Sequence, residues 1–267
     1  LFDTFEDMLF EGSELGHNIL GTKAALARYN GDSIRRFMTR THTTDQMVFS
    51  TIGNMSLKTV QNVAMKYFAG QPSSVRSFKR STPQNVNSFE RQINKHTHQT
   101  HCIVGARAYD INAEKRLPLS LLINILGGPS ANSRLNIVLR EKNGLSYNIE
   151  ASYTPYNDCG AVAIYFSSDH HNADYCRELI DKELLTLRTT RLTARQLSMT
   201  KRQFLAQMAI SMENNEGYML GAGKSYLVHD EIDTLEEVYK KVMAVTAEQV
   251  LEVAEDIFAH TSTLIYQ

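Results

Sequence analysis

The feature that most constrains the fold is a pair of apolar-rich segments joined by a short turn at residues 145–168. In the first segment, apolar and polar side chains alternate from Leu145 to Tyr153. This period of two is typical of a half-buried strand, because successive side chains of a strand point to opposite faces of a sheet. The turn sequence YNDCG then leads into AVAIYFSS (161–168), and an apolar run after such a turn favours a second strand. The two segments therefore predict a β-hairpin.

Helical patterns surround this hairpin. We expect helices at about 1–11, 23–29, 32–40, 56–68, 113–126, 132–141, 171–188, 194–213, 216–228 and 246–258. Further strands are expected at 47–52, 101–109 and 262–267. Thr193 and Thr246 each begin a T-x-x-Q capping box, which is typical of a helix start. This order predicts an α+β fold, with helices packed on a mostly antiparallel sheet.

A change in composition at residues 70–88 divides the chain. The stretch GQPSSVRSFKRSTPQNVNS is rich in Pro, Ser, Gln and Asn and poor in apolar groups, as linkers are. The length of 267 residues also exceeds the usual size of one domain. We therefore expect two domains, residues 1–84 (with the linker from about 70) and residues 85–267. A weak repeat between DSIRRFMTRTHTTDQMVFSTIG and TAEQVLEVAEDIFAHTSTLIYQ suggests that the two domains are related.

Charge and composition exclude several functional classes. The net charge of −1 gives no strong field that would favour nucleic acid or an anionic membrane. No apolar run approaches the roughly 20 residues that a membrane-spanning helix needs, so we expect a soluble protein, in a compartment that remains undetermined. The three cysteines are an odd number without CxxC spacing, which favours free thiols over disulfides or a cysteine zinc site.

Two stretches resemble a known family. Residues 125–153, ILGGPSANSRLNIVLREKNGLSYNIEASY, are similar to the second-domain signature of the insulinase/pitrilysin-type (inverzincin) zinc metallopeptidases. Residues 1–54, with ELGHNILGT and MVFSTIGN, resemble the region that follows the zinc site in the first domain of that family. The helix order up to Gln267 also fits. The resemblance is to the mitochondrial-processing-peptidase-like branch and implies its fold of two facing α+β domains, the first of them incomplete here.

The resemblance also implies where the metal is held. In that family, zinc is bound by an inverted H-x-x-E-H motif and a later Glu, all upstream of the stretch that Leu1–Thr22 resembles. Neither H-x-x-E-H nor H-E-x-x-H occurs in this chain. We therefore expect a fragment that lacks the N-terminal zinc-binding segment, with zinc and the general base in the intact protein only. The chain alone is expected to be inactive and to hold no metal or other cofactor.

Arg140 and Tyr147 are the candidate catalytic residues. In the resembled family, an Arg and a Tyr at this spacing extend from the second domain toward the zinc of the first. A guanidinium and a phenol hydroxyl donate hydrogen bonds to the oxyanion that develops on a peptide carbonyl under attack, and to the substrate backbone. Spacing alone also fits a solvated Arg140 and a Tyr147 on the buried face of its strand.

Other motifs favour simpler interpretations. His96, His98 and His101 lie in KHTHQTH, where a polar strand is a simpler account than a shared metal. The glycines of GGPS (127–130) are not followed by the Lys-Ser/Thr of a phosphate-binding loop, so we expect a turn between helices. No G-x-S-x-G motif is present.

The resemblance implies that the intact protein is a zinc endopeptidase acting on unfolded polypeptides or oligopeptides. Its expected partners are the peptide substrate, the missing N-terminal segment and a homologous subunit or second copy, without nucleic acid. Three alternatives stay open. These are a non-catalytic peptide-binding or scaffolding subunit of the same family, a structural subunit like the core proteins of a respiratory complex, and an unrelated α+β binding module.

Overall fold

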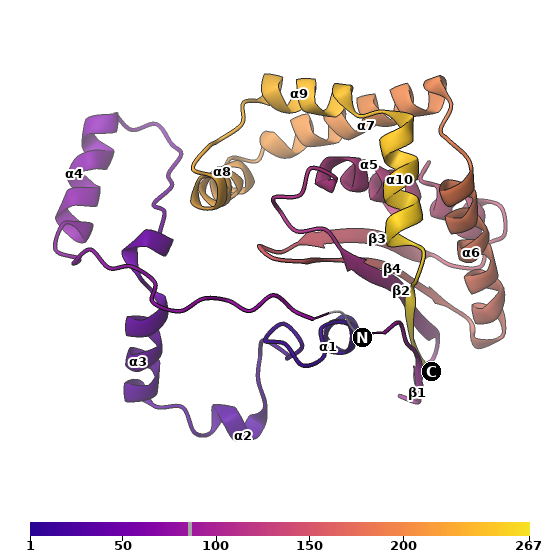
Figure 1. The fold of residues 1–267 in the computed structure, drawn as a ribbon, viewed down its shortest axis with the longest axis horizontal. Coiled ribbons are helices and arrows are strands. Elements are labelled where there is room, and N and C mark those ends of the chain that lie inside the picture. The colour runs from indigo at the N-terminus through magenta and orange to yellow at the C-terminus, as the bar shows by residue number, and fades with distance from the viewer. Residues whose placement is uncertain (85–86) are drawn as a thin grey trace. The chain divides into compact units, whose positions relative to one another are not determined.

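The computed structural model describes residues 1–84 and 87–267 (Figure 1). The chain forms two compact units. The first, here the sheet unit, comprises residues 1–20, 81–205 and 239–267, and the second, the helical unit, comprises residues 21–80 and 206–238. These compact units are not the same as the two predicted domains, 1–84 and 85–267, and that division stays a prediction. Residues 85–86 at the predicted boundary lie outside the described residues.

The sheet unit is built on five strands. Their bounds are β1 Glu90–Ile93, β2 Thr100–Ala108, β3 Asn148–Pro155, β4 Gly160–Ser168 and β5 Ser262–Tyr266. The order across the sheet is β1-β5-β2-β4-β3, and only the β1–β5 pair is parallel. The predicted hairpin is therefore the β3–β4 pair, and the mostly antiparallel sheet of an α+β fold is confirmed.

Helices cover this sheet on both faces. Their bounds are α1 Phe2–Leu9, α5 Arg116–Gly127, α6 Ala173–Thr189, α7 Ala194–Met212 and α10 Ala247–Ile257. Helices α5, α6 and α10 lie on one face and α1 packs on the other (Figure 1). The capping box predicted at Thr246 is present, because Gln249 and Thr246 exchange side-chain and backbone hydrogen bonds. Such a box satisfies backbone N–H groups that the first helical turn leaves unpaired.

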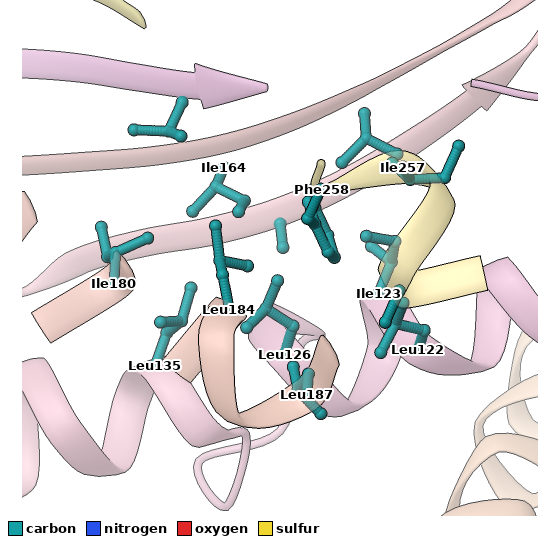
Figure 2. Close-up of a cluster of buried hydrophobic side chains, with 14 of the residues drawn as sticks. Leu122, Ile123, Leu126, Leu135, Ile164, Ile180, Leu184, Leu187, Ile257 and Phe258 are labelled. Atoms are coloured by element: carbon teal, nitrogen blue, oxygen red, sulfur yellow. The ribbon is translucent and has the colours of Figure 1, made fainter. Parts of the chain in front are cut away.

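Alternation along the strands divides the buried side chains between two cores. On β2, Cys102, Val104 and Ala106 face the helices α5, α6 and α10, whereas Ile103 faces α1. The main core also takes apolar side chains from those helices and from β4 (Figure 2). Burial of this apolar surface, at about 25 cal/mol per Å², is the main stabilising contribution to the unit. It holds α5 firmly against the strands.

The helical unit has its own elements and few buried side chains. Its helices are α2 Lys23–Leu26, α3 Gly31–Thr41, α4 Leu57–Phe68 and α8 Asn215–His229. The strand predicted at 47–52 is wrong, because this segment is irregular apart from the preceding 3₁₀ turn at Thr44–Gln46. A strand needs a hydrogen-bonded neighbour, and the described residues of this unit form no strand that could pair with it.

The structure differs from the sequence-based expectations at three further places. The strand β1 was not predicted, since its sequence ERQI is mostly polar and its partner β5 lies at the other end of the chain. The helix α9, Leu235–Ala244, was also missed. His96 and His98 lie in the irregular segment between β1 and β2 rather than on a strand. There His96 has a positive φ of 52°, and its backbone N–H donates to the side chain of Asn94.

Candidate functional site

Arg140 lies near the end of a single wide helical turn, Asn136–Glu141, that has π-helical geometry. The turn is closed by Gly144, which has a φ of +61°. Its N–H donates to the carbonyl of Arg140 at 2.9 Å, and the N–H of Leu145 donates to the carbonyl of Leu139 at 2.8 Å. These two hydrogen bonds are nested as in a Schellman motif but each spans one residue more, in keeping with the π-helical turn. Glycine is favoured at the left-handed position because it has no Cβ. The motif fixes the path of the chain directly after Arg140.

Tyr147 is held outward by the two residues before it. Leu145 packs against the main core, and Ser146 is only 1% exposed. The Ser146 hydroxyl donates to the carbonyl of Asn148 at 3.3 Å. Tyr147 itself precedes the first residue of β3 and is 78% exposed. The alternative that Tyr147 lies on the buried face of the strand is therefore excluded in the sheet unit.

Arg140 and Tyr147 line the same pocket, which has a volume of about 450 Å³. The other lining residues are Gly127, Gly128, Pro129, Ala131, Asn136, Asn148, Ile149, Glu150 and Ala151. The guanidinium of Arg140 has a distant acidic neighbour, with its Nε 3.9 Å from a carboxylate oxygen of Glu141. About half of the Arg140 side chain is exposed. Such a weak surface pair leaves the guanidinium available to a bound group.

The glycine loop has a further role that sequence analysis did not identify. A Cβ on Gly127 would lie 2.7 Å from the Cβ of Ala151 and 2.8 Å from its backbone nitrogen. The end of α5 therefore approaches β3 as closely as it does only because residue 127 is glycine. This contact forms the inner wall of the pocket. Asn136 was also missed, although it precedes Arg140 by four residues, a spacing that places two side chains on one helix face.

The histidines and cysteines form no metal site in the part of the chain that the structure describes. No group of three or more His, Cys, Asp or Glu side chains there is arranged to hold a metal ion, so these residues do not fit a zinc site. His101 Nδ1 lies 2.8 Å from the hydroxyl of Tyr165. All three cysteines are buried free thiols, as predicted. Burial raises the pKa of Cys102 to about 12 and that of Cys159 to about 11, so neither is a ready nucleophile.

A second polar cluster lies at the other end of the β3–β4 hairpin. The Tyr109 hydroxyl donates to Asp256 at 2.5 Å, and Lys115 pairs with Glu252 at 2.7 Å. Burial, and after it the Asp256 carboxylate, raises the pKa of Tyr109. The carbonyl of Tyr109 accepts a hydrogen bond from Tyr153. These contacts tie α10 to the β2 end and account for the cluster as a structural one.

The match to known protein families decides the classification. Residues 28–204 match the family model described as the peptidase M16 inactive domain. The chain belongs to the peptidase M16 inactive-domain family. This confirms the membership in the insulinase-type zinc metallopeptidases that residues 125–153 and 1–54 predicted.

Curated relatives of this M16 chain are named zinc proteases. An uncharacterized zinc protease of Bacillus subtilis (strain 168), YmxG, is 30% identical over 98% of this chain. An uncharacterized zinc protease of Rickettsia bellii (strain RML369-C) is 25% identical, also over 98% of the chain. In both comparisons the chain spans 63% of the length of the relative.

Solved structures share the fold of this M16 chain. The peptidase M16 inactive domain from Pseudomonas fluorescens superposes with a TM-score of 0.89 at 18% identity, over 99% of this chain and 64% of that one. A chain of complex III₂ from Candida albicans superposes with a TM-score of 0.86 at 14% identity, over 99% and 64%. At these identities the likeness establishes the fold. Among the described residues, no helix is long and apolar enough to cross a membrane.

Proposed function

We propose that this chain is the substrate-facing part of a zinc endopeptidase that hydrolyses peptide bonds in unfolded polypeptides or oligopeptides. Zinc and the general base belong, in this proposal, to a part of the protein that the chain does not contain. The chain itself contributes Arg140 and Tyr147. Membership in the M16 family and the zinc-protease names of its relatives support this assignment.

The observation that carries the proposal is the pocket shared by Arg140 and Tyr147. Arg140 lies in the turn Asn136–Glu141 and Tyr147 lies directly before β3, and the left-handed turn at Gly144 connects the two. A guanidinium and an exposed phenol hydroxyl are both hydrogen-bond donors at neutral pH.

The chemistry of these donors matches amide hydrolysis. Attack on a peptide carbonyl turns its oxygen into an oxyanion, and donors placed around that oxygen stabilise the charge more than they stabilise the neutral carbonyl. In this proposal Tyr147 donates to the developing oxyanion. Arg140, with its planar fork of N–H groups, holds a neighbouring backbone carbonyl of the substrate. Neither residue moves a proton.

The experiment that tests this function is the Tyr147→Phe change in the protein that carries this chain together with its zinc-bearing part. Loss of one oxyanion donor lowers kcat by about 100-fold or more. KM changes far less, because the lost hydrogen bond strengthens only in the transition state. The rate is measured on reduced, carboxymethylated lactalbumin, an unfolded substrate. Tyr175→Phe is the matched control, since Tyr175 is 45% exposed on α6 and does not line the pocket.

Two results would contradict the proposal. An unchanged kcat in Tyr147→Phe removes Tyr147 from the mechanism. Hydrolysis by residues 1–267 alone, abolished by a chelator, shows that the metal and base do not have to come from elsewhere. If the complete protein binds the carboxymethylated substrate without hydrolysing it, the chain belongs instead to a non-catalytic, peptide-binding subunit that acts beside a homologous copy.

A further inference from the structure

The strand β3 forms one edge of the sheet. It pairs with β4, and no other strand in the described part of the chain lies beside it. Its eight residues extend for about 26 Å, at roughly 3.3 Å per residue. An edge strand presents a row of backbone N–H and C=O groups that another extended chain can pair with.

The hairpin turn shows which groups of β3 point outward. The N–H of Tyr156 donates to the carbonyl of Cys159 across the turn, so Tyr156 belongs to the set of residues bonded to β4. Backbone direction alternates along an antiparallel strand. The groups of Ile149, Ala151 and Tyr153 therefore face the open edge. Pro155 also belongs to this outward-facing set. A proline is tolerated there because its missing N–H would not have bonded to β4.

The pocket of Arg140 and Tyr147 follows this open edge. Its lining includes the consecutive residues 147–151. Side chains of Ile149 and Ala151 point to the helix-covered face, whereas those of Asn148 and Glu150 point to the opposite face. A pocket that touches residues of both faces runs along the side of the strand, although Ala151 itself is only 7% exposed because the end of α5 packs against it.

The two edges of the sheet differ in how they are protected. At the other edge, β1 has only four residues, and Glu90 and Arg91 are charged. Short strands and charged side chains are the usual devices that prevent an edge from pairing with another chain. In β3 only Glu150 is charged, and a proline occurs only at its last position. Apart from Glu150, the half of β3 next to Arg140 and Tyr147 thus carries neither of these protective devices.

We propose that the extended backbone of the peptide substrate pairs with the outer edge of β3, between Ile149 and Tyr153, and so enters the pocket of Arg140 and Tyr147. This inference rests on the proposed function. The occupant is a peptide backbone because the groups on offer are alternating backbone donors and acceptors, which an extended chain complements and a folded surface or a small anion does not. Pairing of this kind is independent of sequence, as suits an enzyme for unfolded chains.

The test uses the protein that carries this chain together with its zinc-bearing part. A peptide within carboxymethylated lactalbumin that binds or is cleaved is identified by mass spectrometry and then synthesised in two N-methylated forms. One form is methylated at alternate residues and the other at the intervening ones, so the two are matched in composition. Because only alternate N–H groups of an added strand face β3, one form should bind at least about tenfold more weakly than the other. Amide hydrogen exchange at 149–153 should also slow when the unmethylated peptide binds.

The possible outcomes distinguish pairing at β3 from the proposed endopeptidase function. Equal binding of the two methylated forms, or unchanged exchange at 149–153 while peptide is bound, overturns pairing at β3. Hydrolysis and the effect of Tyr147→Phe are unaffected by that result, because they report on the donors at the pocket. Protection at 149–153 without any hydrolysis supports pairing and contradicts the enzymatic role.

Discussion

Replacement of Gly144 by Ala tests whether backbone conformation at one residue holds the candidate site together. Gly144 has a φ of +61°, and an added Cβ would meet no atom within 4 Å. Steric contact therefore contributes nothing, and the cost is conformational. A non-glycine residue in the left-handed region costs about 1–2 kcal/mol, partly offset by about 0.4–1 kcal/mol from the lower entropy of the unfolded chain. We expect a loss of about 1 kcal/mol in the free energy of unfolding.

The assay is urea unfolding followed by amide hydrogen exchange in peptides that span 133–155, so that the sheet unit is observed by itself. Gly144→Asn should lose less stability than Gly144→Ala, since Asn tolerates the left-handed region better. Lys142→Ala is the matched control in the same turn. Lys142 is exposed with a φ of −83°, and its replacement should change stability by less than about 0.5 kcal/mol. If Gly144→Ala is as neutral as Lys142→Ala, the left-handed turn at Gly144 does not stabilise the site.

Two further predictions concern the helix cap and the thiols. Thr246→Ala removes the side-chain half of the capping box of α10 and should cost about 1 kcal/mol in urea unfolding, while Thr246→Ser, which keeps the hydroxyl, should cost much less; equal effects of the two changes would contradict a capping role. Burial raises the pKa of Cys102 to about 12 and of Cys159 to about 11, so at pH 8 the folded chain should react with Ellman's reagent only as it unfolds. Because the folded pKa values lie above the ordinary value of 9.0, the free energy of unfolding should fall as the pH rises from about 9 toward 11. Rapid labelling of any of the three thiols in the native chain would contradict their protection by burial.

Local patterns predicted most elements of the sheet unit. The alternation around Ile149 and the turn YNDCG predicted the β3–β4 hairpin, and the capping box at Thr246 marked the start of α10. Local patterns did not predict strands correctly where strand formation depends on a pairing partner that is distant in the sequence. The segment 47–52 has the composition of a strand, but among the described residues no strand pairs with it, whereas β1 is polar and becomes a strand because β5 lies beside it.

The candidate site also combines features that local patterns predict with features that depend on distant contacts. Arg140 and Tyr147 were identified from the motif REKNGLSY, and their roles stay a prediction. Sequence analysis gave no indication that Gly127 lets α5 approach Ala151, or that the resulting pocket follows the edge of β3. Both depend on contacts between residues that are far apart in the chain.

The sequence by itself predicted the family and the α+β class, which are confirmed, and it named Arg140 and Tyr147 as candidate donors, because a periodic pattern and a short motif are local and can be read along the chain. Only the tertiary structure decided that these two residues share one pocket, that Tyr147 faces outward and that β3 lies at the edge of the sheet that the described residues form. The physical reason is that strand order and close packing are settled by which distant surfaces bury each other. Neither is encoded in the spacing of neighbouring residues.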